Sequence, residues 1–140
     1  MGALTNYTED ELVKHLFRTG SMTKPAALYV GLFTAMPGEA GGGTEVTGGS
    51  YARVAVAPGD ANWAATVGGN GTTSNVSAVT FPAPTADWGA GGQVVGWGIF
   101  DAASAGNLLV YAALATAKSI NNGDPAPSFA AGALTFQIDN

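Results

Sequence analysis

Short apolar segments, separated by Gly, Pro and Asn about every ten residues, most constrain the fold of this chain of 140 residues. Segments of this length suit strands better than helices, and evenly spaced turns are typical of antiparallel sandwiches and jelly rolls. We therefore expect a mostly-β domain, a jelly roll or β-sandwich of seven or eight strands. The expected strands are residues 27–34, 51–57, 62–66, 75–81, 93–100, 108–115, 118–120 and 134–138.

One helix is predicted, near the N-terminus, over about residues 8–19. Thr8 and Glu11 have the spacing of a capping box, and Gly20 is a natural stop. We expect residues 1–140 to form a single domain, in which residues 1–25 are an N-terminal arm and helix. The apolar face of the helix is predicted to be Leu12, Val13, Leu16 and Phe17.

Residues 36–50 form a Gly-rich stretch that is too long for a hairpin turn. We expect this loop to be mobile or to be ordered by a partner. Glu39 and Glu45 flank it and could form a paired-carboxylate site, although the solubility of a loop explains them more simply.

Charged residues are scarce, because only 15 of the 140 residues are Asp, Glu, Lys or Arg. In an average soluble domain, roughly 25% of the residues are charged. A surface with few charges loses little hydration when protein covers it, so the composition favours an assembly subunit over a monomer with a bland surface. The net charge of −5 argues against nucleic acid as a partner, and no apolar stretch is long enough to span a bilayer.

Residues suited to catalysis are few and scattered. His15 is the only histidine, the aspartates lie singly near turns, and cysteine is absent. We therefore expect no enzyme activity, no catalytic residue, no cofactor and no metal site. A small hydrolase built on His15 is the least favoured alternative.

The three tryptophans have different predicted roles. Trp97 lies in an apolar strand and is assigned to the core. Trp63 and Trp88 lie near loops, where core packing, an interface anchor and a stacking platform for sugars are all open.

Several motifs along the chain resemble a family of small structural proteins of tailed bacteriophages, often labelled tail fibre proteins. The motifs are LYVGLFTA (28–35), EVTGGSYAR (45–53), FPAP (81–84), DWG (87–89), VGWGIFD (95–101) and SINNG (119–123). The chain as a whole resembles the capsid cement proteins of short-tailed Bordetella phages, which are of this type. The resemblance implies a jelly-roll fold, homodimers on the outer surface of the head, and a major capsid protein of HK97-like fold as the partner.

Two hypotheses about function follow. In the first, the chain is a capsid cement or decoration protein, and residues 1–7 and 36–50 reach across neighbouring subunits. In the second, it is a tail fibre or tail-associated receptor-binding module. The candidate interface residues are Leu4, Tyr7, Glu39, Glu45, Val46, Trp63 and Trp88.

Overall fold

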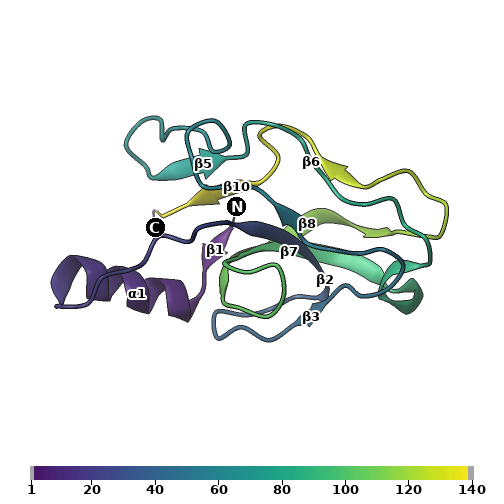
Figure 1. The fold of residues 1–140 in the computed structure, drawn as a ribbon, viewed down its shortest axis with the longest axis horizontal. Helices are drawn as coiled ribbons and strands as arrows, with labels where there is room; N and C mark the ends of the chain where they lie inside the picture. The colour runs from purple at the N-terminus through teal and green to yellow at the C-terminus, as the bar shows by residue number, and fades with distance from the viewer. Residues whose placement is uncertain (1, 139–140) are drawn as a thin grey trace.

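The computed structural model describes residues 2–138, and its largest element is a six-stranded antiparallel sheet (Figure 1). The strand order is β1-β8-β7-β2-β3, and β4 pairs with β2 beyond the end of β3. The longest strands, β2, β7 and β8, form the middle of the sheet. Its members are β1 (Ala3–Leu4), β2 (Tyr29–Ala35), β3 (Thr44–Glu45), β4 (Val54–Ala55), β7 (Gln93–Phe100) and β8 (Leu108–Ser119).

Two short strand pairs form a second layer over one face of this sheet (Figure 1). One pair joins β5 (Thr72–Ser74) to β10 (Thr135–Gln137). The other joins β6 (Val79–Thr80) to β9 (Ser128–Phe129). A short 3-10 helix, η1 (Trp88–Gly91), precedes β7. This arrangement is compatible with a β-sandwich.

The core lies between the two layers and contains two tryptophans. Trp88 is fully buried, and its indole Nε1–H donates to the Gly49 carbonyl at 2.8 Å. The ring packs edge-on against Phe81, which in turn packs against Phe129. Trp97 also lies in the core, as its apolar strand predicts. A buried Trp needs such a partner for its N–H, which explains why the 47–50 turn is held against η1.

The opposite face of the main sheet is covered by aromatic rings. Phe33 and Phe100 stack there at 5.9 Å between ring centroids. They lie close to the backbone because Gly98, which pairs with Gly31 on β2, has no side chain. A Cβ at Gly98 would lie 2.9 Å from the Phe33 ring and 2.6 Å from Leu108 Cδ1. In the Gly-Trp-Gly sequence of β7, Trp97 therefore packs on the core face, and Gly98 leaves room for the aromatic rings on the other face.

The prediction of a mostly-β chain is confirmed, and the jelly-roll connectivity stays a prediction. Strand 93–100 lies where the sequence pattern placed it. Residues 2–138 contain ten strands rather than seven or eight, because five of the ten are only two residues long. Residues 62–66 form no strand, although Trp63 makes an isolated bridge to Asn75.

Helix α1 (Asn6–Phe17) begins two residues earlier than predicted, and the predicted capping box is wrong. Thr5 is the N-cap, and its hydroxyl donates to the Leu108 carbonyl at 2.6 Å. The Thr8 hydroxyl donates to the Leu109 carbonyl at 2.9 Å instead of capping the helix. Tertiary hydrogen bonds to β8 thus outcompete the local cap.

The two segments expected to extend from the domain are held against it. The expected arm of residues 1–7 contains β1, which pairs with Val110 and Tyr111 of β8. Met1 lies outside the described residues. The loop 36–50 is ordered by its own sheet, because β3 pairs with β2 and the Val46 amide donates to the Leu32 carbonyl at 2.9 Å. The end of this loop is therefore held by its own chain, and its mobility or contact with a partner stays a prediction.

Gly98→Ala is predicted to lower the free energy of unfolding by about 1–3 kcal/mol, the usual cost of overpacking. The added methyl group meets Phe33 and Leu108, and neither can move without disturbing the aromatic layer. Urea denaturation measures the change. Gly38→Ala is the matched control, since a Cβ there meets nothing within 4 Å. Equal stability of the two variants would contradict this packing argument.

Candidate interaction surfaces

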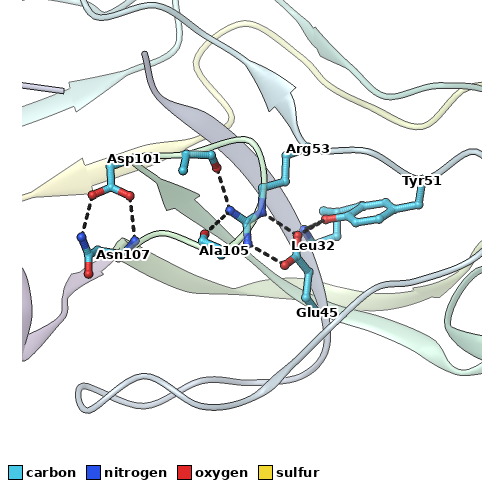
Figure 2. A network of polar contacts seen from close by, with 8 residues as sticks. Leu32, Glu45, Tyr51, Arg53, Asp101, Ala105 and Asn107 are labelled. Atoms are coloured by element: carbon cyan, nitrogen blue, oxygen red, sulfur yellow. Dashed lines mark hydrogen bonds and ion pairs between the residues drawn. The ribbon is translucent and has the colours of Figure 1, made fainter. Parts of the chain in front are cut away.

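A bidentate ion pair between Glu45 and Arg53 lies on the aromatic face of the main sheet (Figure 2). The Arg53 Nε donates to Glu45 Oε1 at 2.8 Å, and Nη2 donates to Oε2 at 2.7 Å. Only 6% of the Arg53 side chain is exposed. Its guanidinium lies 3.4 Å from the centroid of the Phe100 ring. Stacking and the two parallel hydrogen bonds together fix the planar group, which a lysine could not reproduce.

The same guanidinium also holds the loop between β7 and β8. Its Nη1 donates to the carbonyls of Ala102 and Ala105, at 2.7 and 2.8 Å. Asp101 closes this loop by accepting hydrogen bonds from the backbone amide and the side-chain amide of Asn107 (Figure 2). Arg53 therefore joins two loops that are far apart in the sequence.

Tyr51 completes the network from the core side. Its hydroxyl donates to Glu45 Oε1 at 3.0 Å and accepts from the Leu32 amide at 2.8 Å. Burial raises the pKa of Tyr51 well above its usual range, so the hydroxyl stays protonated and remains a donor. Glu45 is thus fully engaged within its own chain.

A cavity of about 330 Å³ opens on the aromatic face, beside the start of α1. Tyr7 and Glu39 both line it, and the Asn6 amide donates to the Glu39 carbonyl at 2.9 Å. Phe33 and Phe100 line it as well. The fold therefore brings together two candidate interface residues that are 32 positions apart in the sequence.

A second cavity, of about 340 Å³, lies between α1 and the body of the protein. It brings together two more candidates, Leu4 and Trp63, and its accessible lining is apolar. Trp63 is partly buried there, against the core cluster. Further lining residues are Leu12, Met22, Leu28, Phe136 and Ile138.

The seven candidate interface residues thus separate into three groups. Val46 and Trp88 are buried in the core, so in this fold they offer no accessible surface to a partner. Glu45 is held by Arg53 and Tyr51. The accessible candidates are Leu4, Tyr7, Glu39 and Trp63. Nearby glycines give Val46 and Trp88 the appearance of loop residues in the sequence, and for Trp88 the structure favours the core-packing alternative.

Sequence reasoning also missed two features of the surface. Arg53 is a single basic residue, and nothing in its spacing marks it as the centre of a network. The apolar spacing of α1 was visible, but three of its residues face solvent, with exposed fractions of 50% for Val13, 60% for Leu16 and 80% for Phe17.

The cavities beside and beneath α1 are the surfaces that gather the accessible candidate residues. Within residues 2–138, no three His, Cys, Asp or Glu side chains gather as metal ligands. No helix in that range is long and apolar enough to cross a membrane. A β-rich fold with one apolar and one mixed surface cavity is of a kind found in structural proteins that work by association.

The comparison with known families agrees with that class. The chain belongs to the family described as podophage GP4 fiber I protein gp80, which matches residues 3–137. It is therefore a member of a family of bacteriophage structural proteins, which suggests a place in the virion. No curated protein matches the chain.

Arg53→Ala is predicted to lower the free energy of unfolding by about 3–5 kcal/mol. The substitution leaves Glu45 partly buried without its partner, and the carbonyls of Ala102 and Ala105 lose their donor. Arg53→Lys retains the charge but not the planar group that makes two parallel hydrogen bonds. It should therefore lower the free energy of unfolding by an intermediate amount. Chemical denaturation measures both variants. Lys118→Ala, at an exposed position, is the control and should change stability by less than about 0.5 kcal/mol. An Arg53→Ala variant as stable as this control would contradict the network's role.

Proposed function

We propose that this protein is a capsid cement protein, which binds the outside of a tailed-phage head and stabilises contacts between major capsid protein subunits. The family match supports a structural role in a podophage particle. The resemblance to cement proteins of short-tailed Bordetella phages supports the head as its location. The protein has no catalytic step in this proposal.

The observation that carries the proposal is the charge-poor surface of an ordered, mostly-β fold. Only 15 of 140 residues are ionised, yet side chains as large as Val13, Leu16 and Phe17 remain exposed. Such a surface is inexpensive to cover with protein, because few hydrated charges are buried. Many copies on a lattice would multiply modest contacts through effective concentration.

The shape of the chain also suits cement better than a fibre shaft. Fibres usually trimerise through long repeats or coiled coils. The described part of this chain has one α-helix of 12 residues, and its sequence contains no heptad pattern.

The cavity beside the start of α1 is the contact surface that we propose for the capsid protein, with its HK97-like fold. Tyr7 is 41% exposed there, and Glu39 lies on the adjoining loop. The 101–107 loop forms another wall, and Arg53 holds it in place. A preformed pocket of this kind limits the ordering cost of binding.

Heads purified from a phage that lacks this protein provide the test. Added protein should sediment with the heads in a saturable manner and should not sediment with purified tails. Tyr7→Ala combined with Glu39→Ala should weaken binding at least tenfold, because both side chains line the proposed contact. These substitutions are sharper than deleting residues 1–7, which would also remove β1.

The control for this test is Lys118→Ala, which lies near the far end of β8 and should bind as the unmodified chain does. Binding to tails and not to heads would overturn the proposal. Undiminished head binding by the Tyr7 and Glu39 variant would move the contact elsewhere on the surface.

A tail fibre component is the second candidate, and the description of the matching family as a fiber protein favours it. A receptor-binding module could stack sugars on exposed tryptophans. Trp88 is buried and Trp63 is partly buried, so neither ring gives this alternative support. Selective binding to tails in the sedimentation test would favour it over cement.

A further inference from the structure

Helix α1 stands over an apolar cavity that its own side chains do not fill. Hydrogen bonds from Thr5 and Thr8 to carbonyls of β8 hold the first turn of the helix against the sheet. Thr8 is the one buried residue of the helix, and Leu12, one turn further on, lines a cavity of about 340 Å³. Residues 22–28, on the way from α1 to β2, supply another part of the wall (Figure 1). The cavity therefore lies between the helix, this connecting segment and the body of the protein.

The wall of this cavity offers a ligand no hydrogen-bonding group. Its accessible lining is apolar. The Thr8 hydroxyl donates to the Leu109 carbonyl at 2.9 Å, and the Thr73 hydroxyl donates to the Ala64 carbonyl at 2.7 Å. Trp63 contributes ring carbon atoms, because its Nε1 is buried. An ordered water needs two or more polar partners, so the cavity suits the apolar part of a ligand better than water.

The volume of the cavity limits the size of that apolar part. An apolar cavity of about 150 Å³ stays dry and accommodates benzene. The cavity beneath α1, at about 340 Å³, is roughly twice as large and corresponds to an apolar body of about ten to twelve carbon atoms. Small-molecule sites in proteins have volumes of roughly 300–1,000 Å³, and this cavity falls within that range.

One charged residue lines the cavity, and it is a base. Lys24 is exposed, and the accessible wall is apolar, so its aliphatic stem forms the wall while its ammonium group reaches solvent at the opening. The two ion pairs within residues 2–138 involve Lys14 and Arg53, which leaves the ammonium group of Lys24 available to an acid. Charge complementarity therefore favours a carboxylate at one end of the apolar body.

We propose that this cavity binds a medium-chain carboxylate, with its alkyl chain beneath α1 and its carboxylate group beside Lys24. Burial of methylene groups supplies most of the affinity. The ion pair is exposed, so it adds little affinity and serves to select the charge of the head group. The site is separate from the cavity lined by Tyr7 and Glu39, and the proposal does not depend on binding to capsids.

Calorimetric titration of the full chain with straight-chain carboxylates, from hexanoate to tetradecanoate and below micelle formation, tests the size of the site. One molecule should bind per chain. The affinity should rise roughly fourfold per added methylene group until about ten to twelve carbon atoms fill the cavity, and it should then stop rising. Absence of saturable binding of decanoate at millimolar concentration would overturn the proposal. An affinity that keeps rising up to tetradecanoate would also overturn it, because only an open surface sets no limit on chain length.

A matched pair of substitutions on α1 tests the location. Leu12→Trp places a larger side chain in the cavity and should weaken decanoate binding at least tenfold. Leu16→Trp, one turn further along the helix, is the control, because Leu16 is 60% exposed and is not among the lining residues. It should bind decanoate as the unmodified chain does. Urea denaturation of both variants separates loss of the site from loss of folding, and a folded Leu12→Trp variant with undiminished binding would overturn the proposal.

Exchange of the charge at position 24 tests the head group without altering the cavity wall beneath the helix. Lys24→Glu should weaken decanoate binding about two- to fivefold and strengthen binding of the decylammonium ion by a similar factor, as expected for an exposed ion pair. Binding of 1-decanol, which is uncharged, should not change. An unaltered preference for decanoate over decylammonium in this variant would contradict the assignment of the carboxylate to Lys24.

A competition experiment distinguishes a small molecule from a segment of the capsid protein as the occupant. Decanoate at saturating concentration should leave the sedimentation of the protein with purified heads unchanged, because the proposed capsid contact lies at the other cavity. Displacement of the protein from heads by decanoate would identify the capsid protein as the occupant and would overturn the small-molecule proposal.

Discussion

Arg53 is the side chain on which the outer face of the structure depends. Its guanidinium lies on the Phe100 ring, binds both oxygens of Glu45 and donates to two carbonyls of the loop between β7 and β8. These contacts fix the Gly-rich segment that contains Glu45 and the short Ala-rich loop 101–107, which have few apolar side chains of their own. Removing a charge from such a nearly buried network leaves its partners unsatisfied, so the network acts as one unit. The cavity beside α1 takes one of its walls from this arrangement.

The sequence predicted the mostly-β fold because its turns and apolar segments are local signals. Strand 93–100 was found correctly for that reason, since Val95, Trp97 and Ile99 alternate there with residues of the other face. Boundaries that depend on distant contacts were missed. The start of α1 is set by hydrogen bonds from Thr5 and Thr8 to β8, about a hundred residues away. Burial of Val46 and Trp88 likewise depends on how the 47–50 turn packs on η1, which no local pattern reveals.

The candidate site was predicted only in part, for a related physical reason. Exposure identifies an interaction residue, and exposure is a property of the assembled fold. Tyr7 and Glu39 lie together at one cavity, and Leu4 and Trp63 lie together at another, whereas Glu45 is held by intramolecular hydrogen bonds. The apolar side chains of α1 are more exposed in the structure than an apolar face in the sequence suggests. Their periodicity predicted an apolar face, but the helix projects from the body and turns much of that face to solvent.

The protein has few ionised groups on its surface, ordered loops and an uncovered helix face. These features fit a protein that performs its function when other protein covers it. The most direct measurement is a cryo-electron microscopy map of the intact virion that contains this chain. We predict a mostly-β density of this fold on the outer surface of the head, seated on the capsid lattice. A map that places the chain only in the tail, or that finds no copy bound to the particle, would contradict this prediction.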